Sequence, residues 1–207
     1  MNIIEGLQSI TDEEILLKCK SADTEFIKKS IEILAQRHQT AIFNYINKII
    51  RDKETAEDLT QETFVRVFNK SREFKKIAKF STWLYRIATN LSLNEIRDRK
   101  IRPYLTLHTP VGNGIDEDEL ISLISSKQAP PETNIQQKEL AHCIEDILQK
   151  LPEKYRLVLI LCDIEQFSYH EVARILRTSA GTIGSRLSRA RRYFIEKFKQ
   201  YIPENEI

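Results

Sequence analysis

Residues 74–97 interleave aromatic side chains with lysines and arginines, a combination suited to unpaired nucleic acid. Aromatic rings stack on base faces, worth about 1–3 kcal/mol per base, while cations neutralise phosphates. The aromatic members are Phe74, Phe80, Trp83 and Tyr85, and the basic members are Lys75, Lys76, Lys79 and Arg86. Helical spacing places Trp83, Arg86, Asn90, Asn94 and Arg97 on one face. Any single aromatic is compatible with a core position, but the set favours contact with a single strand.

A second candidate site has the pattern of a helix-turn-helix over residues 168–192. Ala173 is small where two helices would touch, and the space between them is filled by Ile175, Leu176, Ile183 and Leu187. The outward side of the second helix holds Thr182, Ser185, Arg186, Arg189 and Arg192. Such a helix enters the major groove of duplex DNA, with later arginines on phosphates. An ordinary basic helical hairpin would show the same pattern.

A third, weaker feature is a polar ridge formed by Asp58, Gln61, Glu62 and Val65. Their i, i+3, i+4, i+7 spacing predicts one helix face, opposite the apolar residues Leu59 and Phe64. By itself, such a ridge indicates only a solvated surface.

Nothing in the sequence predicts catalysis, a metal or a cofactor. His38, His108, His142 and His170 show no ligand spacing with the cysteines, and no Gly-rich phosphate loop or nucleophile motif is present. The three cysteines, Cys19, Cys143 and Cys162, are scattered and odd in number, which fits a reducing cytosol. We therefore expect a cytoplasmic, non-enzymatic protein without membrane insertion.

The net charge of +2 conceals an uneven distribution. Residues 66–102 carry 11 Lys/Arg against 3 Asp/Glu, and residues 174–199 carry 8 against 1. Acidic stretches lie before the first basic block and between the two. Solvated helix faces would also give such blocks, but two separate basic segments suit two contact points on a polyanion.

The elements that position these residues are predicted to be all-α. Only 5 glycines and 6 prolines occur in 207 residues, and apolar stripes recur at helical spacing. Capping boxes begin helices at Thr11 and Ser168, and we expect Thr55 and Ser81 to cap two more.

Periodicity is lost over residues 102–136, which contain four prolines, two glycines and the acidic run 116–119. A short helix near residues 119–125 is the one element expected there. The chain is thus predicted to comprise two small helical domains, residues 1–102 and 137–207, joined by a flexible linker, residues 103–136.

Four segments carry a resemblance to a known family. Residues 56–64 (AEDLTQETF) and 81–90 (STWLYRIATN) resemble the second conserved region of bacterial RNA polymerase sigma factors. Residues 151–156 (LPEKYR) and 181–191 (GTIGSRLSRAR) are similar to the fourth region. The length, with only these two regions, resembles the extracytoplasmic-function group.

The resemblance implies partners for each surface. The Asp58-Gln61-Glu62-Val65 ridge would bind the β′ clamp helices of core RNA polymerase, which also contacts the chain through its β subunit. The loop over residues 72–81 and the following helix would capture a flipped base of the melted minus-ten element, with Thr82 joining the residues named above. The minus-thirty-five duplex would be read by Ser179, Thr182, Gly184, Ser185, Arg186, Ser188, Arg189 and Arg192.

The same resemblance implies that the linker threads through the polymerase toward the RNA exit path and that an anti-sigma factor masks these surfaces. Two positions depart from the family. Gly184 stands where arginine or lysine is common, and Glu165-Gln166 stands where a glycine turn is frequent.

The alternative is a helix-turn-helix repressor or activator that acts without polymerase. It would need a dimer surface or a ligand pocket, and it would not need the aromatic and basic helix. The small net charge also disfavours an autonomous DNA binder.

Overall fold

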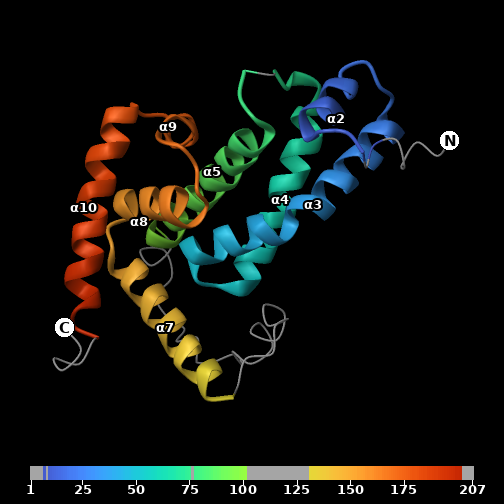
Figure 1. Ribbon diagram of the computed structural model, residues 1–207. Helices are drawn as coiled ribbons and strands as arrows, with labels where there is room; N and C mark the ends of the chain where they lie inside the picture. The colour runs from blue at the N-terminus through green and yellow to red at the C-terminus, as the bar shows by residue number, and fades with distance from the viewer. Residues whose placement is uncertain (1–6, 8, 76, 102–130, 202–207) are drawn as a thin grey trace.

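The computed structural model describes residues 7, 9–75, 77–101 and 131–201, and no strand occurs among them (Figure 1). The N-terminal helices are α2 (Asp12–Lys18), α3 (Thr24–Ile50), α4 (Lys53–Lys70), the 3-10 turn η1 (Ser71–Glu73) and α5 (Phe80–Ile101). The C-terminal helices are α7 (Pro131–Lys150), α8 (Glu153–Leu159), the π-helical turn η3 (Ile160–Ile164), α9 (Tyr169–Leu176) and α10 (Ala180–Phe198). The all-α prediction is confirmed.

The N-terminal helices pack around the long helix α3, which contacts α2, α4 and α5 (Figure 1). Their shared core includes Leu34, Ile42, Tyr45, Ile46, Ile49, Val67, Phe80, Leu84 and Ala88. Burial of this apolar surface supplies the main stabilisation. The predicted apolar face of α4 points inward: Phe64 is buried, and Leu59 is half-buried and packs against the core.

Two predicted helix caps are wrong. Asp52, and not Thr55, caps α4, because its extended backbone lets its carboxylate accept the Thr55 N–H at 2.7 Å. Helix α5 begins at Phe80, ahead of the expected cap Ser81, where the carboxylate of Glu13 accepts the Phe80 N–H at 2.6 Å. Because the carboxylate that accepts the Phe80 N–H belongs to a helix distant in the sequence, the residues around Phe80 do not predict this cap.

The C-terminal helices form the predicted helix-turn-helix. Ser168 begins α9 with a complete capping box, and Ser179 caps α10 by accepting the Thr182 N–H at 3.1 Å. Arg177 ends α9 with φ 51°, the left-handed conformation that usually calls for glycine. Of the residues expected between the two helices, Ala173, Ile175, Ile183 and Leu187 are buried, and Leu176 is half-buried.

The predicted linker is partly helical. Helix α7 begins at Pro131, so the last linker residues, 131–136, belong to it. Residues 103–130, with the acidic run and the short helix expected near residues 119–125, lie outside the described part. None of the described helices is long and apolar enough to cross a membrane.

Candidate polymerase-binding and nucleic-acid interfaces

The ridge on α4 faces solvent. Asp58 and Gln61 are exposed, and Glu62 is half-buried with its carboxylate accepting from Arg66 Nε at 2.8 Å. Val65, at the end of this ridge, is an exposed apolar side chain, with 51% of its surface accessible. Acidic, amide and apolar groups are therefore presented together on one rigid helix.

The aromatic residues of the 74–97 segment divide into two groups. Phe74, Phe80 and Tyr85 are buried, together with Thr82. Trp83 is half-buried, and its ring centroid lies 5.4 Å from that of Phe74 and 6.2 Å from that of Phe80. Two core phenylalanines thus support the partly exposed indole, and helical spacing could not show which rings face inward.

The polar members of this segment are more accessible. Lys75, Lys79, Asn94 and Arg97 are exposed, and Arg86 and Asn90 are half-buried. Lys76 lies outside the described residues. Burial lowers the pKa of Arg86, with a smaller effect from the nearby Arg177. The structure thus brings most of the predicted cations to the solvent side of α5 and its preceding loop.

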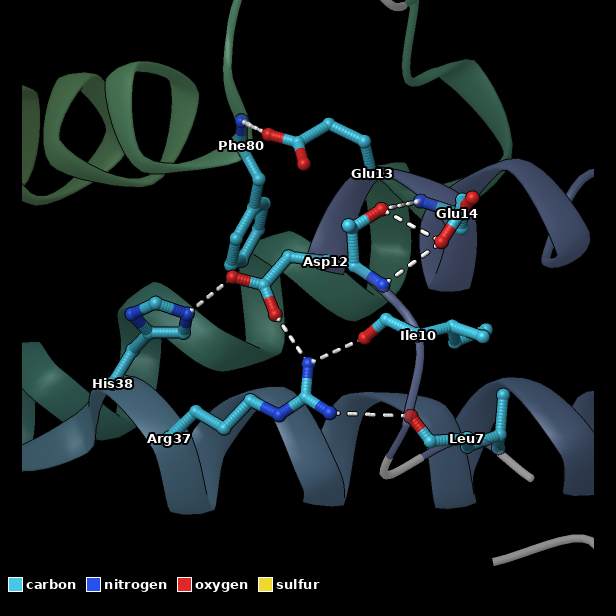
Figure 2. Close-up of polar contacts among 9 residues, drawn as sticks. Leu7, Ile10, Asp12, Glu13, Glu14, Arg37, His38 and Phe80 are labelled. Carbon is cyan, nitrogen blue, oxygen red and sulfur yellow. Dashed lines mark hydrogen bonds and ion pairs between the residues drawn. The ribbon is translucent and has the colours of Figure 1, made fainter. Parts of the chain in front are cut away.

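A set of hydrogen bonds around Asp12 and Glu13, which the sequence did not predict, holds the start of α5 in place (Figure 2). Arg37 of α3 donates to the carbonyl oxygens of Leu7 and Ile10 and to the Asp12 carboxylate at 2.6 Å. His38 Nε2 donates to the other Asp12 oxygen at 2.7 Å. These contacts fix α2 beside α3, which places Glu13 against the Phe80 N–H.

The first turn of α5 has no acidic residue of its own, so Glu13 both caps the helix and complements its dipole. The His38 ring adds an edge contact to the Phe80 ring, with centroids 5.3 Å apart. The capping box at Thr11 was visible in the sequence, but only the fold shows that Glu13, within that box, also caps α5.

We expect Asp12→Asn to lower the free energy of unfolding by about 1.5–3 kcal/mol, the range for hydrogen bonds to charged groups. Burial opposes ionisation of Asp12, but the hydrogen bonds from His38 and Arg37 outweigh it and lower the pKa. The stabilisation is therefore present above the unfolded pKa of about 3.9 and is lost as pH falls through the lower folded pKa. Denaturant unfolding across pH checks this, since an equal wild-type advantage at acidic and neutral pH would contradict it.

Helix α10, the second helix of the helix-turn-helix, presents its predicted polar residues to solvent. Ser179, Ser185, Ser188, Arg189 and Arg192 are exposed, and Thr182, Gly184 and Arg186 are half-buried. Ser179 and Thr182 also share a hydroxyl hydrogen bond of 2.8 Å, so these two polar groups hold the helix N-terminus.

Three arginines of α10 lie close to residues outside the helix. Arg189 lies beside the Tyr155 hydroxyl and, with smaller effects from Lys154 and Arg186, lowers its pKa. Arg191 pairs with both carboxylate oxygens of Asp163, at 2.6 and 2.9 Å. This fixes η3 against α10 and leaves Arg186, Arg189 and Arg192 as the cations near the predicted DNA face.

Position 184 has room for a side chain. A Cβ there would lie 3.7 Å from the Tyr169 ring, an ordinary van der Waals contact.

No group of His, Cys, Asp and Glu that could hold a metal ion occurs in the described ranges. Burial raises the pKa of Cys162 to about 11, so that thiol stays protonated at neutral pH.

Comparison with known proteins matches both halves of the chain. The sigma-70 region 2 family model matches residues 34–101, and the sigma-70 region 4 model matches residues 141–193. The ECF RNA polymerase sigma factor SigW of Bacillus subtilis is 34% identical over 154 residues, which cover 74% of this chain and 81% of SigW. The RNA polymerase sigma-H factor of Pseudomonas aeruginosa is 29% identical over 181 residues, covering 87% and 90%.

Solved structures share the fold. CnrH, in complex with the cytosolic domain of CnrY, has a TM-score of 0.64 at 20% identity and covers 91% of this chain and 97% of its own. The sigma factor RpoE of Bartonella quintana, in complex with the anti-sigma factor NepR, has a TM-score of 0.60 at 22% identity, covering 83% and 98%. With both family regions matched in order and a relative of 34% identity, the chain belongs to the extracytoplasmic-function group of bacterial RNA polymerase sigma factors.

Proposed function

We propose that this sigma factor binds core RNA polymerase through the α4 ridge and holds promoter DNA at two places. The observation that carries the proposal is that each matched family region presents a distinct polar surface. The α4 ridge and the cationic face of α5 belong to region 2, and the outward face of α10 belongs to region 4.

The acidic ridge suits the β′ clamp helices, and further contacts involve the β subunit. Asp58, Gln61 and Glu62 offer carboxylates and an amide, and the exposed Val65 offers apolar contact at the same surface. A desolvated apolar position ringed by polar groups is a common arrangement for a binding hot spot.

The loop before α5 and the face around Trp83 hold unpaired minus-ten bases. A flipped base costs a few kcal/mol to extract from the stack, and stacking with phosphate neutralisation repays that cost. The half-buried Trp83 offers a ring that two phenylalanines keep rigid, and Lys75, Lys79 and Arg97 supply charge beside it.

Helix α10 reads the minus-thirty-five duplex from the major groove. Ser185, Ser188 and Thr182 lie toward its N-terminal half, where side chains reach base edges, and Arg189 and Arg192 follow for phosphates. The linker, residues 103–136, passes through the polymerase toward the RNA exit path.

The chain acts in the cytoplasm as a specificity subunit, and polymerase supplies the catalysis. An anti-sigma factor controls it by covering these surfaces. The solved complexes of CnrH with CnrY and of RpoE with NepR support that partner class.

Gel filtration of the full chain with purified core polymerase tests the proposal against an autonomous repressor. We expect the two to co-elute as a complex that then retains promoter DNA. A chain that bound duplex DNA tightly alone, and did not co-elute with core enzyme, would contradict it.

At position 184 we expect Gly184→Arg to tighten holoenzyme binding to the upstream element. The change removes a helix-interior glycine, worth about 1 kcal/mol, and adds a cation beside the duplex. The dependence of affinity on salt should steepen by roughly one unit for the added phosphate contact. Binding is measured by titration at several salt concentrations.

Gly184→Ala is the matched control, because it gives the gain in helix propensity without the charge. It should raise the melting temperature and leave the salt dependence unchanged. If the arginine variant binds no better than the alanine variant, position 184 does not face the DNA backbone.

A further inference from the structure

Helix α2 and the turn after it hold both ends of the loop over residues 72–81. At the α5 end, the Glu13 carboxylate accepts the Phe80 N–H at 2.6 Å (Figure 2). At the η1 end, Arg72 Nη2 donates to the carbonyl oxygen of Ala22 at 3.1 Å, and α2 itself contacts η1. One N-terminal segment, residues 12–22, therefore fixes where the loop leaves η1 and where it enters α5.

The two rings that support Trp83 come from these two ends of the loop. Phe74 lies two residues after Arg72, and Phe80 is the residue whose N–H binds Glu13; both rings are buried. The Trp83 ring centroid lies 5.4 Å from that of Phe74 and 6.2 Å from that of Phe80. The orientation of the indole therefore depends on how firmly both ends are held.

The N-terminal segment is itself firmly attached to α3. Ile15 and Leu16 are fully buried in the shared core. The Asp12 carboxylate accepts from Arg37 at 2.6 Å and from His38 at 2.7 Å (Figure 2). These contacts give Glu13 a fixed position relative to the core, so its hydrogen bond ties the start of α5 to that core.

The source of this cap is unusual for a surface that binds DNA. The residue ahead of Phe80 is Lys79, whose ammonium group can only donate and so cannot cap α5. A serine or asparagine there would bind the same backbone groups without a negative charge. The chain instead keeps an exposed cation at position 79 and takes the acceptor from α2, which joins α5 to a segment that a local cap would leave unconnected.

We propose that Glu13 is a positioning residue for promoter opening, which holds the start of α5 so that Trp83 meets the flipped base in a fixed orientation. Glu13 acts through the Phe80 backbone and does not contact DNA. This inference rests on the proposed role of α5 at the minus-ten element. A preorganised surface loses less freedom on binding, so release of the α5 start weakens base capture. A carboxylate repels phosphates, so lost attraction for the strand cannot explain a defect on its removal.

The test uses the full chain, in which Trp83 is the single tryptophan. Its emission maximum and its quenching by acrylamide report the surroundings of the indole without DNA. Glu13→Ala removes the bond to Phe80, whereas Glu13→Gln keeps a carbonyl oxygen that can accept it and loses only the charge. Arg72 is a poorer target, because it is exposed and its replacement would also remove a cation beside the strand.

Asp52→Ala is the matched control. Asp52 caps α4 by accepting the Thr55 N–H at 2.7 Å, so this variant loses one capping carboxylate from the same half of the chain. Melting temperatures of the variants show whether the two losses of stability are comparable. Single-round transcription by holoenzyme then compares a fully paired promoter, found by mapping transcription starts, with the same template mismatched across the minus-ten region.

We expect Glu13→Ala to shift the Trp83 emission to the red and to raise its quenching. Transcription from the paired promoter should fall roughly tenfold, as suits one lost hydrogen bond to a charged group, while the mismatched template stays largely active. Glu13→Gln should resemble the wild type in fluorescence and on both templates. Asp52→Ala should lower the melting temperature but leave the fluorescence and the ratio between templates unchanged.

Three results would overturn the proposal. The first is an unchanged fluorescence and template ratio for Glu13→Ala. The second is the same change in Asp52→Ala, which would mean that lost stability alone is responsible. The third is a Glu13→Gln variant as impaired as Glu13→Ala, which would mean that the charge acts and not the bond. Equal loss on both templates for Trp83→Ala would instead contradict the role of α5 itself, so the two failures are distinguishable.

Discussion

Replacing both Asp58 and Glu62 by arginine should abolish association with core RNA polymerase while the protein stays folded. Both residues lie on the solvent side of α4, and surface substitutions usually change stability by less than about 0.5 kcal/mol. The double change reverses the charge of the ridge. A basic surface would then face the polymerase surface that we propose binds the acidic ridge. Like-charge juxtaposition at an interface costs several kcal/mol, enough to remove measurable binding.

The matched control is Glu25→Arg/Glu32→Arg on α3, which changes net charge equally. Glu25 pairs with Lys29 one turn later at 3.3 Å, as Glu62 pairs with Arg66 at 2.8 Å, so the two variants lose comparable intrahelical ion pairs. Pull-down with core enzyme and circular dichroism give the readout. Undiminished binding by the ridge variant, or an equal loss of binding in the control, would show that the ridge is not the surface that contacts polymerase.

Trp83→Ala should slow transcription from a fully paired promoter and leave a template pre-opened across the minus-ten region largely active. Loss of an aromatic stacking surface removes about 1–3 kcal/mol per base. On a mismatched template the bases need not leave the stack, so the missing contribution matters less. The measurement is single-round transcription by holoenzyme on the two templates in parallel.

Trp83 also packs on Phe74 and Phe80, so its replacement carries a structural cost. Full burial would make that cost about 3–5 kcal/mol, but the indole is only half-buried. Asn90→Ala, on the same face of α5, removes a polar group without emptying the aromatic cluster. Equal loss on both templates with a lowered melting temperature would assign Trp83 to the core, and rescue on the open template alone would support base capture.

Local patterns in the sequence predicted the helices but not the contacts between them. The capping boxes at Thr11 and Ser168 and the helix-turn-helix were visible because each depends on residues within one or two turns. The cap of α5 was missed because its acceptor, Glu13, lies 67 residues away. Asp52, and not Thr55, is the N-cap of α4. Both residue types suit that position, and only the backbone conformation decides between them.

Exposure at the candidate site was the harder part to predict. Spacing correctly placed the α4 ridge in solvent, because its polar and apolar faces are cleanly divided. In the 74–97 segment, aromatic residues occur on both faces, so spacing could not separate the buried Phe80 and Tyr85 from the half-buried Trp83. Burial of Tyr85 also depends on Phe167 and Glu165 from the other half of the chain.

Mapping transcription start sites after overproduction of this chain tests most directly whether it directs polymerase to its own set of promoters. New starts should share two upstream elements at constant spacing, and the Asp58→Arg/Glu62→Arg variant should induce none of them. New transcripts without shared elements, or the same starts from the ridge variant, would contradict the account.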